Sequence, residues 1–300
     1  MVESKRPVDV FVDVLIHVVI VIACFLCLIP LLNTLALSFS SSVMASSGTV
    51  SFWPKQFTLA AYEAIVGEKQ FFGAFWISIK RVVLGGTINF LMMVLCAFPL
   101  AHSEKAFRGR NVYMYFLIFT MLFSGGLVPT YIIVGKMGLM NTLWALILPG
   151  SYSIWYIILV RSYFRTIPES LRESAKLDGA NSYRILWNVF LPTSKPILAV
   201  IALYTIIGVW NSWYHASIYI TDHDWQPLQL YLRRILIEQT EQLGDMMDDA
   251  EAMRRAQQQQ ISNNQMKYTV IIVSSLPMLI AYPFFQQYFV KGVMLGSLKE

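Results

Sequence analysis

Residues 173–180 read Glu-Ser-Ala-Lys-Leu-Asp-Gly-Ala, and residues 189–192 read Val-Phe-Leu-Pro. This polar, helix-forming segment interrupts a chain that is otherwise strongly apolar. Pro168 suits the first turn of a helix, and the carboxylate of Glu173 lies early enough to favour the positive end of the helix dipole. Gly179 stands where the chain leaves that helix, a position that commonly needs a left-handed residue. The sequence therefore predicts a surface helix that ends at Gly179.

A second short helix is expected over residues 183–190, because Asn181 or Ser182 can cap its first turn. Pro192 is expected to end this second helix. The apolar residues of both helices are spaced so that each has a side that can be buried. These residues are Leu171, Ala175 and Leu177 in the first helix and Tyr183, Leu186, Trp187 and Phe190 in the second.

The composition of the chain is that of a membrane protein. Of its 300 residues 56% are hydrophobic and only 14% are charged, and the mean hydropathy is +0.54. A soluble domain carries about 25% charged residues. Apolar runs of about 20 residues recur, which is the length of helix that crosses a hydrocarbon core of roughly 30 Å. Because backbone groups in lipid must be hydrogen-bonded internally, and because the runs do not alternate, we expect helices rather than a barrel.

We expect an all-α integral membrane protein with six transmembrane helices. These spans fall at residues 12–37, 75–100, 112–134, 141–160, 196–219 and 269–290. The first run is too long for the apolar part of a signal peptide, so it is expected to remain in the chain. The three cysteines, Cys24, Cys27 and Cys96, all fall inside spans, where packing explains them better than redox or metal chemistry does.

The distribution of positive charge predicts the orientation of the spans. Loops 101–111 and 161–195 carry nine Lys and Arg residues, whereas the alternate short loops 38–74 and 135–140 carry three. Cationic loops stay in the cytoplasm, so both termini are expected there as well. The net charge of +5 therefore reflects membrane topology, and the cations form no continuous basic surface for a nucleic acid.

Two features interrupt the apolar spans, and each has two explanations. Lys80 and Arg81 lie near the expected outer start of the second span, where they either reach the membrane interface or line a polar cavity. Gly125, Gly126 and Pro129 lie in the third span, where they either break the helix beside an aqueous cavity or form a simple kink.

Further motifs are spread over most of the chain. They are Leu-Val-Pro-Thr-Tyr at 127–131, Gly-Leu-Met-Asn-Thr at 138–142, Trp-Asn-Ser-Trp at 210–213, Pro-Leu-Gln at 227–229 with Leu-Arg-Arg-Ile-Leu at 232–236, and Gln-Tyr-Phe-Val-Lys-Gly-Val-Met-Leu-Gly at 287–296. With the segment 173–192, whose pattern is Glu-small-Ala, three residues, Gly, nine residues, aliphatic-x-Leu-Pro, they resemble permease subunits of bacterial ATP-driven importers. The resemblance is to the second permease of maltose-type (MalG-like) carbohydrate importers, in the polysaccharide and oligosaccharide (LplC-like) branch. Ser174 and Glu300 depart from that family, which usually has Ala and often Gly at these positions.

The resemblance implies a type-1 ABC importer permease fold in the bacterial plasma membrane, with each task given to a separate subunit. A homologous permease would form the other half of the translocation path, and an extracellular solute-binding protein would deliver an oligosaccharide. The chain lacks a phosphate-binding loop, so two partner ATPase subunits would bind ATP and Mg²⁺, and this chain would bind no cofactor or metal. It would have no catalytic residue. The positions that would couple to the ATPase are Glu173, Ser174, Ala175, Asp178, Gly179, Ala180, Val189, Leu191 and Pro192.

The same scheme divides the chain into three parts. Residues 1–74 hold the N-terminal cytoplasmic segment, the first span and an outer loop, residues 75–290 form the permease domain, and residues 291–300 form a cytoplasmic tail. The permease domain includes a coupling loop at 164–194 and an outer loop at 220–268. The outer loop contains an expected helix at 228–238, and it either docks the binding protein or forms a solvated cover.

Residues of the substrate path are expected near the outer part of the fifth span and at Gly126 in the third. They are Trp210, Asn211, Trp213, Tyr214 and Gly126. Aromatic rings suit the C–H faces of sugars and an amide suits their hydroxyls, but Trp and Tyr also anchor spans at the membrane interface. Two other functions stay open: a permease of the same kind for a non-sugar solute, and a helical scaffold protein. A scaffold would not require the spacing seen in residues 173–192.

Overall fold

The computed structural model describes residues 7–241 and 265–287, and describes side chains over 8–235 and 265–287. In these ranges the named elements are helices, together with one isolated antiparallel bridge between Ser40 and Phe57. Compact packing divides the chain into two units. One comprises Met1–Glu68 with Leu232–Ser275, and the other comprises Lys69–Tyr231 with Leu276–Glu300.

Three described helices are long and apolar enough to cross a membrane without a break. They are α1 (Pro7–Ser38), α4 (Lys69–Ala101) and the helix Gln265–Gln287. They confirm the spans expected at 12–37, 75–100 and 269–290, apart from residues 288–290, which lie outside the described part. None of the most apolar window of α1 is buried inside the chain, so its side chains need lipid or another subunit.

Three pairs of helices pass the same test only together, because each pair is sharply bent. Helices α5 (Arg110–Leu122) and α6 (Leu127–Lys136) meet at 108°, and α7 (Leu143–Ile147) with η1 (Leu148–Gly150) meets α8 (Ile154–Phe164) at 49°. The segment Ser182–Thr193 meets α12 (Lys195–Asn211) at 83°. The described residues thus hold up to six spans, if each bent pair counts as one.

The spans expected at 112–134, 141–160 and 196–219 are not continuous helices in the structure. The third span breaks at residues 123–126, where Gly126 has a φ of +87° that other residues rarely adopt. The fourth stops at Gly150 and resumes at Ile154. The fifth ends at Asn211, two residues before the short helix α13 (Tyr214–Tyr219). Of the two explanations for Gly125 and Gly126, a true break replaces the simple kink.

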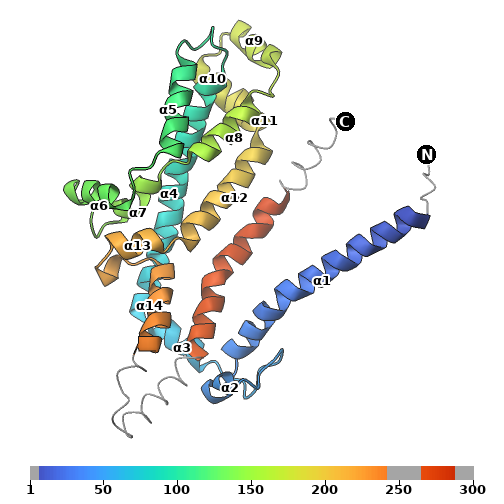
Figure 1. Ribbon diagram of the computed structural model, residues 1–300, viewed down its shortest axis with the longest axis vertical. Helices are drawn as coiled ribbons and strands as arrows, with labels where there is room; N and C mark the ends of the chain where they lie inside the picture. Colours follow the sequence, from blue (N-terminus) through green and yellow to red (C-terminus); the bar gives the residue numbers. More distant parts are fainter. Residues whose placement is uncertain (1–6, 242–264, 288–300) are drawn as a thin grey trace. The chain divides into compact units, whose positions relative to one another are not determined.

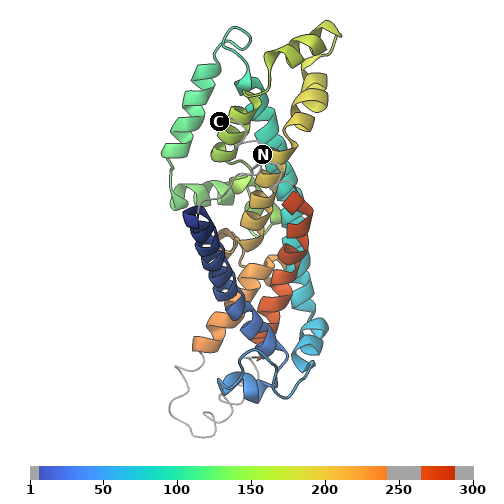
Figure 2. The same ribbon diagram turned by 90° about the vertical axis from the view of Figure 1, so that its right-hand side faces the viewer.

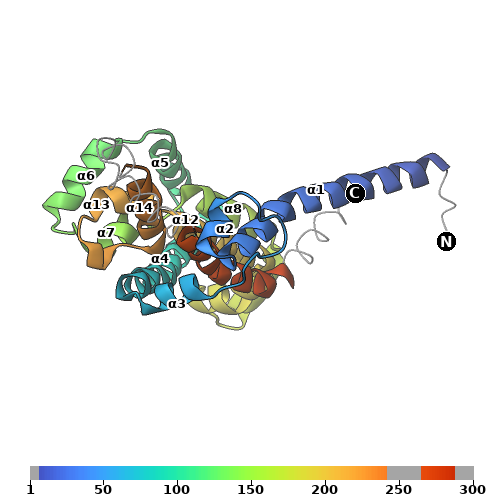
Figure 3. The ribbon, with the colours of Figure 1, turned by 90° about the horizontal axis from the view of Figure 1, so that it is seen from below.

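Helix α4 is the centre of the larger unit, with α8 and α12 packed along it (Figure 1). Their buried cluster also includes side chains from α5 and from residues 185–190. These residues follow helix α9, which spans Glu169–Leu177. The cluster comprises Met93, Val94, Ala97, Phe98, Leu100, Met114, Ile157, Val160, Phe164, Ile185, Leu186, Phe190, Leu198 and Ile201. Seen from below, α6, α7 and α13 lie together beside α4, where Val134, Ala145 and Tyr219 form a second cluster (Figure 3). Helix α14 (Leu228–Glu241) confirms the helix expected at 228–238.

In the other unit, the short helices α2 (Ser42–Ser46) and α3 (Ala60–Gly67) follow α1. The start of the helix Gln265–Gln287 packs on this region, because Ser42 donates to the amide oxygen of Gln265 at 2.9 Å and Thr269 donates to the Ser38 carbonyl at 3.3 Å. The acidic and glutamine-rich part of the expected outer loop, residues 242–264, lies outside the described residues.

Candidate functional site: a helical hairpin and the polar cavity beneath it

Helix α9 lies beyond the end of α4 and joins the following helix through a tight turn (Figures 1 and 2). Pro168 is its N-cap, one position before the first helical turn in which it was expected. At the other end, Gly179 has the left-handed φ of +78° that its position predicts. Its N–H donates to the Lys176 carbonyl at 3.0 Å, and the N–H of Ala180 donates to the Ala175 carbonyl at 2.9 Å. These two bonds form a Schellman motif, which satisfies carbonyls that the helix end leaves free.

The second arm of the hairpin runs over Ser182–Thr193. It consists of α10 (Ser182–Ile185), a π-helical turn η2 (Leu186–Phe190) and α11 (Leu191–Thr193). The side chain of Asn181 accepts from the Arg184 N–H at 2.9 Å, so Asn181 is the cap. Pro192 lies one residue before the end of this arm at Thr193, so the arm ends next to the proline, as the sequence predicts, and α12 begins beyond it at Lys195.

The buried side of the hairpin differs in part from the expected one. Leu186 and Phe190 are buried as expected, together with Ile185, whereas Tyr183 and Trp187 are exposed. Leu177 is 89% exposed, because it lies two residues, or about 200° of helical turn, from the inward-facing Ala175. Four apolar side chains of the hairpin, Leu171, Leu177, Tyr183 and Trp187, are therefore exposed, although the sequence predicts them on its buried sides.

The residues expected to couple to an ATPase divide into two sets. Those exposed on the hairpin are Glu173, Ser174, Asp178, Gly179 and Pro192. Those half-buried against the core of the larger unit are Ala175, Ala180, Val189 and Leu191. The structure thus brings all nine to one hairpin, with one set free to meet another protein and the other anchoring the hairpin to α4 and α8.

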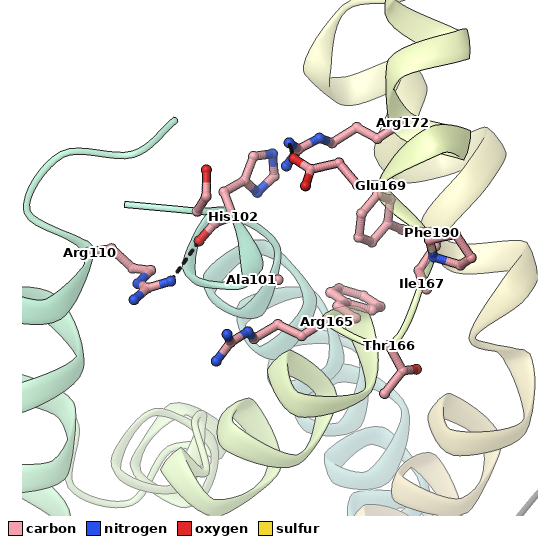
Figure 4. Close-up of a pocket in the computed structure, with 12 residues that line it drawn as sticks. Ala101, His102, Arg110, Arg165, Thr166, Ile167, Glu169, Arg172 and Phe190 are labelled. Atoms are coloured by element: carbon pink, nitrogen blue, oxygen red, sulfur yellow. Dashed lines mark hydrogen bonds and ion pairs between the residues drawn. The ribbon is translucent and has the colours of Figure 1, made fainter. Parts of the chain in front are cut away.

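A cavity of about 380 Å³ lies at the base of the hairpin, among the ends of α4, α5, α8 and α9 (Figure 4). Its lining is rich in cations and includes His102, Arg110, Arg165 and Arg172. Glu169 supplies a carboxylate, which forms an ion pair with Arg172. Its polar lining brings together residues from the ends of α4, α5, α8 and α9.

Basic side chains hold the carbonyls that α4 leaves free at its C-terminal end. Arg161 donates to the Leu100 carbonyl at 2.9 Å, and Arg110 donates to the His102 carbonyl at 3.0 Å. A ring nitrogen of His102 lies 2.8 Å from the Phe98 carbonyl. Positive charge at this end also complements the helix dipole, so α4, α5 and α8 are joined where the hairpin begins.

Among the residues that line this cavity, His102 has a pKa that differs from its ordinary value. Burial lowers the pKa of His102, the cationic side chains of Arg172 and Lys176 lower it further, and the Phe98 carbonyl and Glu169 oppose them. The imidazole is therefore neutral at pH 7, which leaves the cavity with fewer positive charges than its residue types suggest.

The expected substrate-path residues are more scattered. Trp210 is buried, with its ring 5.9 Å from that of Phe75. Asn211 and Tyr214 are exposed, and the Tyr214 ring lies 5.7 Å from that of Trp213. The fifth, Gly126, sits at the α5–α6 break described above.

Lys80 and Arg81 have different environments. Lys80 is exposed, but Arg81 is 5% exposed and lines a second cavity of about 170 Å³. For Arg81 the structure favours the polar-cavity explanation, because its side chain is buried and lines this cavity. Among the residues with described positions, no group of His, Cys, Asp and Glu is suited to hold a metal ion.

Helices of membrane length, helices broken within the spans and an exposed hairpin at the helix ends are the features of an α-helical membrane protein. The chain belongs to the family of binding-protein-dependent transport system inner membrane components, whose sequence model matches residues 71–295. It is therefore an integral inner-membrane transport subunit and not an enzyme.

Two curated relatives and one solved structure resemble the chain over most of its length. Protein LplC of Bacillus subtilis is 36% identical over 91% of this chain and 89% of its own. The polygalacturonan/rhamnogalacturonan transport system permease protein YtcP of the same organism is 34% identical, over 96% of this chain and 98% of YtcP. A chain of a bacterial ABC transporter that imports the acidic polysaccharide alginate superposes with a TM-score of 0.81 and 28% identity, over 95% of this chain and 99% of that one.

Proposed function

We propose that this chain is one of two permease subunits of an ATP-driven, binding-protein-dependent importer of oligosaccharides derived from polysaccharides. The observation that carries the proposal is the near full-length similarity to a permease for polygalacturonan and rhamnogalacturonan, supported by the similarity to a chain of an alginate importer. A homologous permease would complete the path, and an extracellular binding protein would deliver the sugar. A permease for a non-sugar solute is the alternative that the transport assay below tests.

The hairpin Glu169–Thr193 is the part of the chain that would receive motion from the ATPase. Its exposed carboxylates, Glu173 and Asp178, can make charge-assisted hydrogen bonds, and the exposed Leu177 and Trp187 can fill apolar recesses of a partner. ATP and Mg²⁺ would be bound by the two ATPase subunits, and this chain would bind neither.

The orientation follows from the same assignment. Coupling to a cytoplasmic ATPase requires the hairpin in the cytoplasm, in agreement with the cations of loops 101–111 and 161–195, and it places both termini on that side. Single cysteines replacing Lys176 and Lys55 test this, in a variant without the native cysteines. In sealed right-side-out vesicles, an impermeant thiol reagent is expected to label the cysteine at position 55 and not the one at 176. The reverse labelling would contradict the orientation.

We propose the residues of the substrate path from the places where the helices end or break. Asn211, Trp213 and Tyr214 flank the end of α12, and Gly126 marks the break between α5 and α6. Irregular backbone at membrane depth is tolerated where it lines a cavity, which supports a path along these breaks. Trp210 would support that path by packing on α4.

The proposed function is tested by reconstituting both permeases, the ATPases and the binding protein into liposomes. Uptake of an oligosaccharide that depends on ATP and on the binding protein is the expected result. Glu173→Ala is expected to reduce coupled uptake while the permease pair still assembles, whereas Glu104→Ala, on the neighbouring cytoplasmic loop, is expected to leave uptake unchanged. Full uptake and normal ATPase assembly with Glu173→Ala would contradict the coupling role. Uptake of other solutes but of no oligosaccharide would contradict the substrate class.

A further inference from the structure

Arg81 is a buried cation at the point where α12 ends. Its Nη1 donates to the Ser212 carbonyl at 2.7 Å, and its Nη2 donates to the Ser212 hydroxyl at 3.2 Å. Ser212 is the C-cap of α12, so the guanidinium also lies at the negative end of that helix dipole. These contacts explain how the chain tolerates Arg81 at this depth, but they neutralise only part of its charge.

The rest of that charge has no anionic partner in the described part of the chain. Both hydrogen bonds of Arg81 go to neutral oxygens of Ser212, and its Nε is buried with no hydrogen-bond partner. Its titratable neighbour in the cavity is His215, which is not an anion. An unpaired charge inside a membrane protein costs several kcal/mol, and such residues usually mark the route of a substrate or an ion. Arg81 therefore keeps a buried donor that a ligand could use.

The cavity beside Arg81 has room for one. Its volume of about 170 Å³ is far above the ~15 Å³ that one water needs, so a carboxylate group fits, and the lining also includes apolar residues such as Ile147 and Val209. Three glycines, Gly85, Gly150 and Gly208, contribute to its walls together with Ser212. The cavity lies where α12 stops and the chain restarts as α13, and discontinuous helices of this kind form the substrate sites of many transporters.

The polar character continues along the same face of α4. Gly85 and Asn89 follow Arg81 at intervals of four residues, so the three lie above one another on the helix. Asn89 is buried, donates weakly to the Gly150 carbonyl at 3.4 Å, and leaves its side-chain oxygen without a partner. A donor and an acceptor thus remain unused within two turns of one helix face, which suits a ligand that carries both carboxylate and hydroxyl groups.

We propose that Arg81 receives the carboxylate of an acidic sugar unit during transport, so that the imported oligosaccharides contain uronic acids. This inference rests on the proposed function and narrows its substrate class. The free Nε and the adjacent Nη2 are the pair of donors with which a guanidinium grips a carboxylate through two parallel hydrogen bonds. The Nη1 bond to the Ser212 carbonyl stays in place and keeps the guanidinium oriented.

The test uses the full importer in liposomes and a matched pair of substrates: an oligogalacturonate of three to five units and its methyl ester, which has the same rings without the charge. Three variants are compared with the unchanged chain. Arg81→Gln removes the charge but can still donate to the Ser212 carbonyl, Arg81→Lys keeps the charge without the fork, and Lys80→Gln removes the exposed neighbouring cation. Basal ATPase activity of each assembled complex reports whether the fold and the assembly are intact.

Loss of one charge-assisted contact is expected to lower uptake of the acid about tenfold or more in Arg81→Gln, with uptake of the ester and basal ATPase activity changed less than about twofold. Arg81→Lys should fall between, and Lys80→Gln should match the unchanged chain. If the unchanged importer takes up only the acid, the ester cannot serve as the control. The inference is then supported if Arg81→Gln keeps basal ATPase activity and Arg81→Lys restores part of the acid uptake.

Other outcomes overturn the inference. Equal loss of both substrates in Arg81→Gln, or loss of basal ATPase activity, would mean that Arg81 is structural or pairs permanently with a carboxylate of the partner permease. No loss of either would mean that Arg81 contacts no substrate. Uptake of neutral oligosaccharides alone would overturn this inference and leave the proposed function standing, whereas uptake of neither class would overturn both.

Discussion

Gly179 allows the coupling hairpin to be tested by changing the backbone alone. Its φ of +78° lies in the left-handed region, and a Cβ built there would meet no atom within 4 Å. A substitution therefore adds conformational strain without a steric clash. The strain falls on the Schellman turn, where Gly179 and Ala180 donate to α9.

The left-handed conformation costs an L-residue about 1–2 kcal/mol, and a β-branched residue lies at the upper end of that range. Since 1.4 kcal/mol is a factor of ten, the equilibrium that orders the turn should weaken about fivefold in Gly179→Ala and about thirtyfold in Gly179→Val. Asn tolerates this conformation best among the other residues, so Gly179→Asn is the matched control and should change little.

The assay has two readouts on the reconstituted importer. Hydrogen exchange of the peptide that contains Gly179 and Ala180 should accelerate by these factors, in the order Asn, Ala, Val. Sugar-stimulated ATPase activity should fall in the same order, while basal activity stays. The reasoning is refuted if Val exchanges and couples as Gly does, or if Asn is worse than Ala.

Four further predictions concern the hairpin and the cavity at its base. Phe190 packs edge-on against Phe98 at 5.0 Å and Phe164 at 5.2 Å, so Phe190→Ala should cost about 3–5 kcal/mol and lower the Tm of the purified permease pair. Trp187→Ala, on the exposed side, should leave that Tm unchanged but weaken copurification with the ATPase; equal Tm losses would contradict the assignment of the two sides. Asn181→Ala removes the cap of the second arm and should cost about 1 kcal/mol of local stability, seen as faster exchange of the Arg184 amide with unchanged Tm. The pKa of His102 lies below its ordinary 6.5 in the folded chain, so the unfolded chain binds more protons and stability falls as pH drops from about 6.5 toward the folded pKa. His102→Gln should reduce this acid sensitivity of the Tm, and an unaltered pH profile would contradict the role of His102.

The sequence alone determined the class of the protein and the local form of its hairpin. Apolar runs of membrane length and the bias of Lys and Arg depend only on transfer of residues into lipid, which is nearly independent of tertiary packing. The cap at Asn181 and the left-handed exit at Gly179 depend on interactions between residues a few positions apart. Local chemistry of this kind can be read directly along the chain.

Only the tertiary structure decided where the helices break and which residues are buried. Because α12 stops at Asn211, the Ser212 carbonyl can accept a hydrogen bond from the buried guanidinium of Arg81. These two residues are 131 positions apart in the sequence. The split between outward Glu173 and inward Ala175 is likewise set by the packing of α9 on a core drawn from several distant helices. Contacts between distant segments leave no periodic trace in the sequence, so a polar residue in an apolar run could not be assigned to the interface or to a cavity until the helices were placed.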